Sequence, residues 1–372
     1  MIFFIFLAGF SLFQVVVMGP VPIEDGQIIH MPTKTTITAQ QSFEQLTKSR
    51  VVLVGESHSD ANHHRIQLQI IKAIKQRHNK LAIGLEMFPG HLQPQLDRWI
   101  AGEFTEEQFL DAVEWYSVWG FDAELYLPIF RFARDNKIPL VGMNIKRDVV
   151  SQVRKQGVEG VDEKIRKQLP AMAAASNDYR VSLQKVFNSH PMMARMGEFE
   201  HFMQAQLVWD GVMASRIKGW LDKNPDGLMV ALAGSGHIAN GYGIPHQLSN
   251  LGIDQIKTVL PWTISEDWVD PQVADYVWGV TKPEEAPPPV RFGVMLGRFV
   301  DGVEIKSVLP DSLAAGVGII ADDKITHLNG EKITSSHNLI RKTRELNWGE
   351  SVVLTVLRRN KKTEFKIDLK QP

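Results

Sequence analysis

The sequence contains the pattern Gly-x-x-His twice, and each copy directly follows a short apolar run. The first copy runs from Gly55 to His58, after VVLV, and the second from Gly234 to His237, after LMVALA. Glu56 lies inside the first copy. Imidazole and carboxylate side chains carry much of the acid–base chemistry of proteins near neutral pH, and both bind transition metals. The paired pattern therefore predicts a catalytic or binding site if the two copies meet in space.

Other polar side chains follow two further apolar runs. Glu86 comes after LAIGL, and Asn144 comes shortly after IPLVG, with Arg147 one turn later. Open parallel sheets bind ligands beyond the carboxyl ends of their strands, so we expect these residues at one sheet edge with His58 and His237. A single histidine behind a strand more often serves the structure than a function. Two matched copies beside a glutamate favour a site.

The elements that must position these residues alternate between strands and helices. Short apolar runs predict five strands, at Val51–Val54, Leu81–Leu85, Ile138–Gly142, Leu228–Ala233 and Ile256–Leu260. Helices are expected between them, the clearest being Asn62–Arg77 and Glu198–Leu221. Strands separated by helices of this length form right-handed βαβ units. We therefore expect an α/β fold with a mainly parallel sheet flanked by helices, and a helical insertion near Lys164–Pro191.

The composition limits the chemistry of the chain. Its 372 residues include 41 Lys and Arg against 42 Asp and Glu, and this near-zero net charge argues against nucleic-acid binding. The sequence has no cysteine, which excludes disulfides, thiolate catalysis, Cys-ligated zinc, iron–sulfur clusters and a lipid-anchored cysteine. The length exceeds what one hydrophobic core usually fills, so two domains are expected.

Residues 1–20 form an apolar run without a charged residue, and the chain turns polar after Pro20. The run predicts a signal peptide or an N-terminal anchor, and therefore export to the periplasm or cell envelope. A spanning helix needs about 20 residues, so the run is barely long enough for one. A buried helix is the alternative, although an almost uninterrupted apolar run suits an amphipathic core helix poorly.

The clearest boundary lies at residues 281–289, TKPEEAPPP, where four prolines exclude a helix interior and predict a stiff linker. Residues 290–372 after it resemble a PDZ domain, a small α+β fold. RFGVM looks like the carboxylate-binding loop and its strand, and SHNLIRKTRE like the groove-lining helix. The resemblance implies that a peptide adds as a strand while Phe292, Gly293 and Val294 hold its carboxylate. A packing module that binds nothing is the alternative.

Five segments before the linker resemble, in chain order, the ChaN family of haem-binding uptake proteins within the Tiki/TraB/erythromycin-esterase-like group. They are VVLVGESHSDANHH, GLEMFP, PLVGMNIKRDVV, AQLVWDGVMA and ALAGSGHIANGYGIP, and the resemblance spans about residues 40–262. It implies an α/β domain, export to the cell envelope, and a role in haem or iron acquisition. In the Tiki branch, the paired motifs and a glutamate form a metal-dependent peptidase site. By position these residues are His58, His237 and Glu86, with Glu56 nearby.

The resemblance also implies a tyrosine as the ligand of haem iron, without placing it in a motif. Tyr242 follows the second Gly-x-x-His closely, so we expect it to lie nearest to the site. The other candidates are Tyr116, Tyr126, Tyr179 and Tyr276.

The leading hypothesis is an exported haem-binding protein with a role in haem or iron uptake. In this hypothesis the PDZ domain recruits a C-terminal peptide or an envelope protein, and a homodimer is an open alternative to a monomer. The residues expected to contact haem are His58, His237, Tyr242, Asn144 and Arg147.

The main alternative is a metal-dependent hydrolase. Here His58, Glu86 and His237 bind a divalent ion such as Zn, Mn or Fe, and Glu56 acts as general base toward a bound water. Glu56 and Glu86 are then the catalytic carboxylates. A third hypothesis, an interaction scaffold with a degenerate site, leaves the two matched histidine motifs unexplained.

Overall fold

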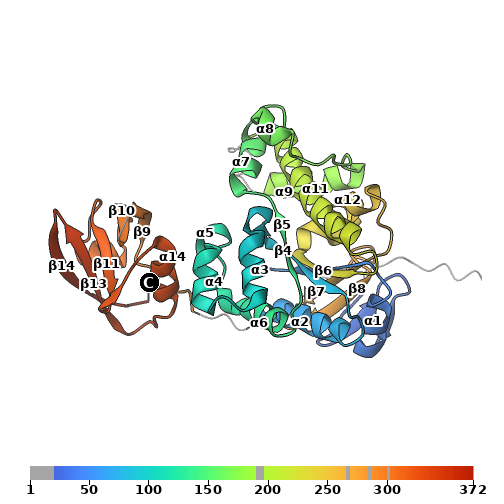
Figure 1. Ribbon diagram of the computed structural model, residues 1–372, viewed down its shortest axis with the longest axis horizontal. Helices are drawn as coiled ribbons and strands as arrows, with labels where there is room; N and C mark the ends of the chain where they lie inside the picture. The colour runs from blue at the N-terminus through green and yellow to red at the C-terminus, as the bar shows by residue number, and fades with distance from the viewer. Residues whose placement is uncertain (1–20, 190–196, 265–268, 284–286, 300–301, 372) are drawn as a thin grey trace, which may run out of the picture.

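The computed structural model describes residues 21–189, 197–264, 269–283, 287–299 and 302–371. An N-terminal α/β unit and a smaller C-terminal β-rich unit lie side by side along the long axis (Figure 1). The predicted signal peptide or anchor, residues 1–20, lies outside the described residues. Among the helices of the described part of the chain, none is both long enough and apolar enough to cross a bilayer.

The N-terminal unit contains an eight-stranded sheet in the order β2-β1-β8-β7-β3-β6-β4-β5. Its strands are β1 (Ile28–His30), β2 (Thr35–Ile37), β3 (Val51–Glu56), β4 (Leu81–Pro89), β5 (Leu140–Asn144), β6 (Leu228–Gly234), β7 (Ile256–Thr263) and β8 (Tyr276–Val280). Every neighbouring pair from β8 to β5 is parallel, whereas β1 pairs antiparallel with β8 and β2. The mainly parallel sheet predicted from the sequence is confirmed, and an antiparallel edge extends it.

Helices cover both faces of this sheet (Figure 1). Successive side chains of a strand point to opposite faces. In β3, Val52 and Val54 accordingly belong to one core cluster, and Val51 and Leu53 to another. The first cluster packs against α1 (Ala39–Leu46), α2 (Ala61–Lys75), α3 (Gln93–Ala101) and α6 (Leu127–Asp135), and the second against α11 (Phe199–Lys223) and α12 (Ile244–Asn250). Burial on both faces explains why the strand segments read as unbroken apolar runs.

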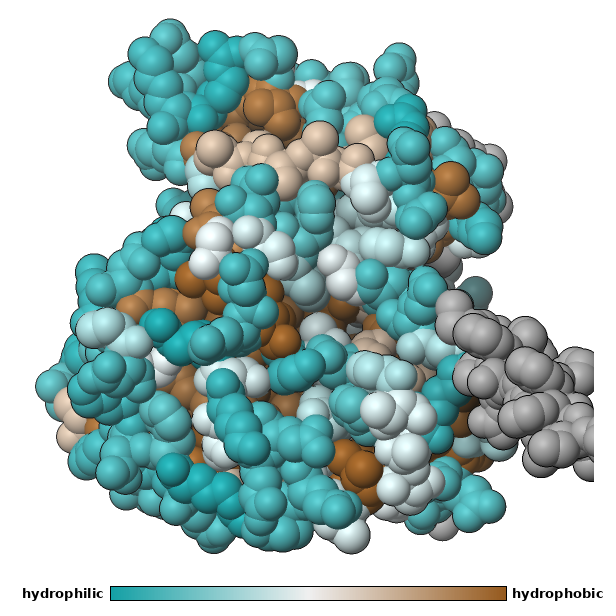
Figure 2. Space-filling view, turned by 90° about the vertical axis from the view of Figure 1, so that its right-hand side faces the viewer, coloured by the Kyte–Doolittle hydropathy of each residue, from teal (hydrophilic) through white to brown (hydrophobic). Residues whose placement is uncertain are grey.

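Three helices form a lobe at one end of the sheet, beside α11 (Figure 1). They are α7 (Arg147–Gln156), α8 (Glu163–Arg166) and α9 (Asn177–Ser189). The last two agree with the helical insertion expected near residues 164–191. Seen from the side away from the C-terminal unit, the surface is mostly hydrophilic and its hydrophobic patches are small (Figure 2).

The C-terminal unit is an antiparallel sheet in the order β14-β13-β11-β10-β9, with β12 paired to β11. Its elements are β9 (Val294–Phe299), β10 (Gly302–Val308), α13 (Leu313–Gly316), β11 (Lys324–Leu328), β12 (Glu331–Lys332), α14 (Ser336–Arg344), β13 (Ser351–Arg358) and β14 (Lys361–Asp368). The unit has its own core, around Val303, Ile305 and Leu354. The predicted small α+β fold is confirmed. Two short helices of the N-terminal unit, α4 (Glu106–Ala112) and α5 (Trp115–Val118), lie next to α14.

Candidate functional site

Four neighbouring strands, β3, β6, β4 and β5, end at the same edge of the sheet. Residues at the ends of β3, β4 and β5 line a cavity of about 470 Å³, which we call the strand-end pocket, whereas His237, which follows β6, is not in its lining. The pocket is lined by His58, Glu86, Asn144 and Arg147, four of the residues that the sequence assigned to the site. The parallel register explains this convergence, since Glu56 at the end of β3 pairs with Gly234 at the end of β6.

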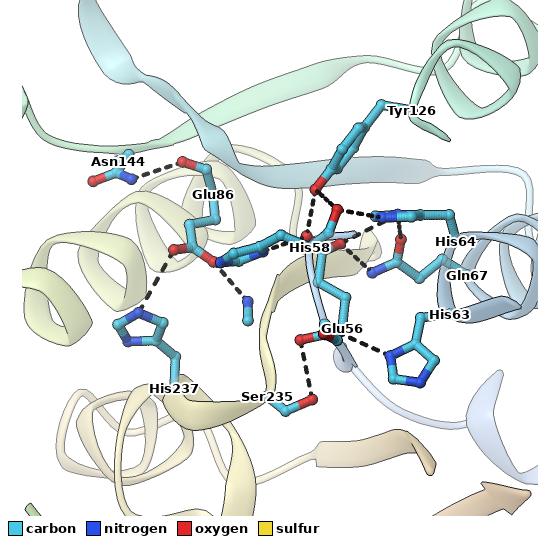
Figure 3. A network of polar contacts seen from close by, with 12 residues as sticks. Glu56, His58, His63, His64, Gln67, Glu86, Tyr126, Asn144, Ser235 and His237 are labelled. Atoms are coloured by element: carbon cyan, nitrogen blue, oxygen red, sulfur yellow. Dashed lines mark hydrogen bonds and ion pairs between the residues drawn. The ribbon is translucent and has the colours of Figure 1, made fainter. Parts of the chain in front are cut away.

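Glu56 lies behind the pocket and anchors a buried network (Figure 3). Its Oε1 accepts hydrogen bonds from the Tyr126 hydroxyl and from Nδ1 of His58, each at 2.8 Å. Its Oε2 accepts one from Gln67 at 2.7 Å and lies 3.5 Å from Nδ1 of His64. A buried carboxylate with this many donors is stabilised in its charged form. Glu56 therefore holds His58 through Nδ1.

The two partners shift each other's pKa values. Burial acts to raise the pKa of Glu56, but the hydrogen bond from His58 and the charge of His64 outweigh it, so this pKa lies below its ordinary value. Burial acts to lower the pKa of His58, but the hydrogen bond to Glu56 and the charge of Glu86 outweigh it and raise this pKa. The pair is thus an imidazole held by an ionised carboxylate.

A second histidine–carboxylate arrangement surrounds Glu86 (Figure 3). The Oε2 atom of Glu86 accepts the Gly234 N–H at 2.6 Å, and its Oε1 lies 3.6 Å from Nε2 of His237. Nδ1 of His237 donates to Asp210 at 2.6 Å, and Asp210 also accepts the hydroxyl of Tyr179 at 2.7 Å. Burial acts to lower the pKa of His237, but the charges of Glu86 and Asp210 raise it to about 9. His237 is therefore held from both sides as a cation at neutral pH.

Aromatic rings form the walls of the strand-end pocket. The ring centroids of Trp119 and Phe121 lie 4.7 and 4.9 Å from that of His58. Trp209 lines the pocket as well and donates its Nε1–H to Asn144 at 2.6 Å. The pocket thus combines flat apolar walls with two imidazoles, that of His58, whose Nδ1 is already engaged, and that of His91.

The structure does not bring Tyr242 to the pocket. Its ring packs 5.8 Å from that of Tyr179, in a separate cluster on α9 and α11. The chain turns after His237 through Gly241, whose φ of 70° lies in the left-handed region. No tyrosine is among the residues that line the pocket in the described part of the chain. The remaining tyrosines are buried by their own packing (Tyr126, Tyr179 and Tyr276) or lie beside the C-terminal unit (Tyr116).

The metal site expected from His58, Glu86 and His237 is not supported. Within the described residues, no group of three His, Cys, Asp or Glu side chains is placed to hold a metal ion. Nδ1 of His58 is bonded to Glu56, Nδ1 of His237 is bonded to Asp210, and Glu86 accepts a backbone N–H. The two Nδ1 bonds do not by themselves block a metal, because such carboxylates also orient metal-binding imidazoles. What the described residues lack is a common point that all three side chains face, so the structure does not favour the metal-dependent hydrolase alternative.

Several residues of the site were not assigned from the sequence. Gln67 donates to Glu56, the partner of His58, and Asp210 is bonded to Nδ1 of His237. Both side chains are fully buried, in helices that face the sheet. A polar residue on the apolar face of a helix is the signal that could have identified them, because such residues are rarely buried without a partner. Trp119 and Phe121 lie outside any regular strand pattern, so spacing could not place them.

The C-terminal unit holds a second cavity, of about 660 Å³, which we call the peptide groove. It lies between α14 and the edge strand β9, and Phe292, Gly293 and Val294 line it as expected. Gly293 has a φ of 76°, and a Cβ on it would lie 2.3 Å from the Cβ of Ser312. Only glycine fits there, so the loop at the end of the groove is fixed by its sequence.

Two family models match the chain. The model described as haem-binding uptake, Tiki superfamily, ChaN matches residues 42–248, and the PDZ domain model matches residues 281–369. The first match covers more than half of the chain and includes both Gly-x-x-His motifs.

Three similar proteins each match part of the chain. A solved structure of ChaN from Campylobacter jejuni, described as showing cofacial haem binding, superposes with a TM-score of 0.56 at 20% identity, over 69% of this chain and 98% of that one. The protein RETICULATA-RELATED 5, chloroplastic, of Arabidopsis thaliana is 23% identical over 69% of this chain, and the alignment spans 37% of its length. A probable periplasmic serine endoprotease DegP-like of Brucella suis is 29% identical over 36% of this chain, and the alignment spans 24% of its length.

Proposed function

Because this chain belongs to the ChaN family of haem-binding uptake proteins in the Tiki superfamily, we propose that it binds haem in the strand-end pocket. The observation that carries the proposal is the position of His58. Its Nδ1 is bonded to buried Glu56, and its ring forms part of a pocket walled by Trp119 and Phe121. A carboxylate on the far nitrogen orients an imidazole and makes it a stronger iron ligand.

The pocket suits a large flat ligand in size and in lining. Its volume of about 470 Å³ falls within the range of pockets that bind drug-sized ligands. Aromatic rings bind the face of a porphyrin by stacking. Lys146 and Arg147, both exposed, line its rim beside Asp148, whose carboxylate is turned back onto the N–H of Val149. The two cations are suited to pair with propionate carboxylates.

His58 is the residue best placed to bind the iron, since haem iron commonly takes an imidazole ligand. The Tyr126 hydroxyl and Gln67 hold the Glu56 carboxylate, and Glu56 in turn fixes the ring of His58. Glu86 and His237 form a charged pair at the back of the pocket. In this proposal Glu56 and Glu86 position the histidines, and neither carboxylate performs a reaction.

Titration of the purified chain with ferric haem, followed by the Soret band, tests the proposal. We expect saturable binding, with affinity at least tenfold weaker in His58→Ala. Tyr242→Phe is the matched comparison, because the family resemblance points to a tyrosine whereas the geometry points to His58. A Soret band that survives in His58→Ala and is lost in Tyr242→Phe would refute the placement of haem in this pocket.

We also propose that the protein works in the cell envelope and that its PDZ domain recruits a partner that ends in a free carboxylate. The apolar run of residues 1–20 and the similarity to a periplasmic DegP-like protein support export. Residues 1–40 fused to a reporter that is active only outside the cytoplasm should give an active reporter. An inactive reporter would contradict export.

A further inference from the structure

One short segment of the N-terminal unit forms a wall of both cavities. Within residues 115–121, Tyr116 lines the peptide groove, Trp119 and Phe121 line the strand-end pocket, and Ser117 lines both. The groove of the C-terminal unit is therefore completed by the N-terminal unit. A ligand in either cavity would touch this 115–121 segment.

The helix α14 lines the groove and also contacts the N-terminal unit, and Arg344 does both. Ile340 and Thr343 line the peptide groove. His337, Arg341 and Arg344 follow one another at i, i+4 and i+7, a spacing that places them on one face of the helix. That face contacts α4 and the 115–121 segment. Arg344 and Tyr116 therefore belong both to the groove and to the contact between the two units.

The contact between the units is specific. The backbone N–H of Tyr116 donates to Nδ1 of His337 at 3.2 Å, and their rings stack with centroids 5.1 Å apart. Arg344 donates to the carbonyl of Gly120 at 3.0 Å and places its guanidinium 4.9 Å from the Tyr116 ring centroid. These bonds fix the 115–121 segment against α14.

The charges at this contact are complementary but imperfectly paired. Glu107 and Asp111 lie one turn apart on α4, and Arg341 forms an ion pair with Glu107. The Oδ1 atom of Asp111 lies 3.2 Å from Nε2 of His337, yet neither atom makes a hydrogen bond within the described residues, and nor does buried Nε of Arg341. Unsatisfied buried polar atoms raise the energy of the arrangement that contains them.

The 115–121 segment has an unusual backbone conformation at both of its flanks. Glu114 before it has a φ of 48° and Gly120 near its end has a φ of 88°, so both flanks use the left-handed region. For glutamate this conformation is strained. On the inner side of the segment, Trp119 and Phe121 pack directly on His58. Movement of the segment would change the surroundings of that imidazole.

We propose that the peptide groove and the strand-end pocket are coupled through the 115–121 segment. The ligand of the groove is a peptide with a free carboxyl terminus and acidic residues upstream, because the described lining contains Arg291 and Arg344 but no Asp or Glu. Such a peptide contacts Tyr116 and changes the environment of His58. The inference rests on the peptide binding proposed above, and by linkage each ligand changes the affinity of the other by the same factor.

A random decapeptide library with free carboxyl termini, selected on the full chain, supplies the probe. We expect enriched peptides to be acidic, and saturation with a synthetic one to shift the NMR signals of the His58 ring, assigned with His58→Gln. With haem bound, the Kd of the peptide should change by about fivefold or more. The NMR readout needs no haem, so it also decides the inference if haem binding fails.

Tyr116→Ala removes a ring that lines the groove, so its own peptide-binding curve is measured first, and at a peptide concentration that saturates this variant the His58 signals should stay unchanged. The control is Phe365→Ala, a similar loss of an aromatic ring on β14, at the sheet edge opposite the groove strand β9. A peptide that saturates the protein but leaves the His58 signals unchanged would overturn the coupling alone. Failure to select any peptide would overturn both the coupling and the proposed recruitment, whatever the result of the haem titration.

Discussion

The hydroxyl of Tyr126 donates a hydrogen bond of 2.8 Å to Oε1 of Glu56, and both side chains are buried. The bond joins the N-cap residue of α6, a helix on one face of the sheet, to the carboxyl end of β3. Burial and the nearby charge of Glu56 raise the pKa of Tyr126, so the phenol stays protonated and remains a donor. The position of the site's central carboxylate thus depends on a residue far away in the sequence.

Removal of this hydroxyl should destabilise the N-terminal unit. Tyr126→Phe leaves a buried carboxylate one donor short, and a hydrogen bond to a charged group contributes about 1.5–3 kcal/mol. Tyr276→Phe is the control, since Tyr276 is equally buried but donates to the neutral Gln45 side chain, where about 0.5–1.5 kcal/mol is expected. Urea unfolding followed by tryptophan fluorescence measures both losses. Equal losses would contradict an ionised Glu56.

Neutralising Glu56 should weaken haem binding without removing His58. Glu56→Gln keeps the shape of the side chain but takes the negative charge from the imidazole, and loss of such a supporting carboxylate lowers metal affinity by about 10–100-fold. The Soret titration of the variant checks this. Glu106→Gln, at an exposed ion pair with Arg131, is the matched control. Unchanged affinity in Glu56→Gln would mean that His58 is not the iron ligand.

The sequence predicted the edge of the sheet where the site lies, because strand ends can be located from local patterns. Each apolar run gives a strand, and in parallel strands the residues that follow must meet at one edge. This reasoning placed His58, Glu86, Asn144 and Arg147 correctly around one cavity. The parallel order of the strands was the only long-range information that this reasoning needed.

The partners of these residues could not be predicted in the same way. Asp210 reaches His237 from a helix, and Trp119 reaches His58 from a short irregular segment. Both contacts depend on tertiary packing, for which local spacing carries no signal. Local spacing also could not show that the expected metal ligands His58, Glu86 and His237 are not grouped to hold an ion within the described residues. Tyr242 was misplaced because nearness along the chain was taken for nearness in space.

Alkaline pH should weaken the fold through His237. Its pKa of about 9 lies above the unfolded value of 6.5, so its stabilising contribution is complete below pH 6.5 and is lost as the pH rises through 9. The contribution is at most about 3 kcal/mol. Free energies of unfolding measured from pH 6.5 to 9 should fall in the wild type and fall less in His237→Gln. Identical slopes in the two proteins would show that His237 is not held as a cation.

Acidic pH should loosen the contact between the two units through His337. Burial and the charge of Arg341 lower its pKa to about 4. A proton on Nδ1 would remove the acceptor of the Tyr116 N–H. The stabilisation that neutral His337 gives to the contact between the two units is complete above pH 6.5 and is lost as the pH falls toward 4. Burial raises the pKa of Asp111, and protonation of this carboxyl opposes the loosening caused by His337. The ion pair of Arg341 with Glu107 persists as long as the Glu107 carboxylate stays ionised.

Hydrogen exchange of the Tyr116 amide measures this loosening directly. After correction for the intrinsic pH dependence of exchange, its protection should fall between pH 6.5 and 4. The Tyr126 amide, bonded to the carbonyl of Ala123 at 2.9 Å, serves as the internal control and should keep its protection. His337→Phe retains a ring to stack on Tyr116 but cannot titrate, so its protection at Tyr116 should be lower at neutral pH and independent of pH over this range. If Tyr116 stays equally protected at both ends of the range in the wild type, His337 does not control docking, since a charged imidazole at this position cannot accept the hydrogen bond.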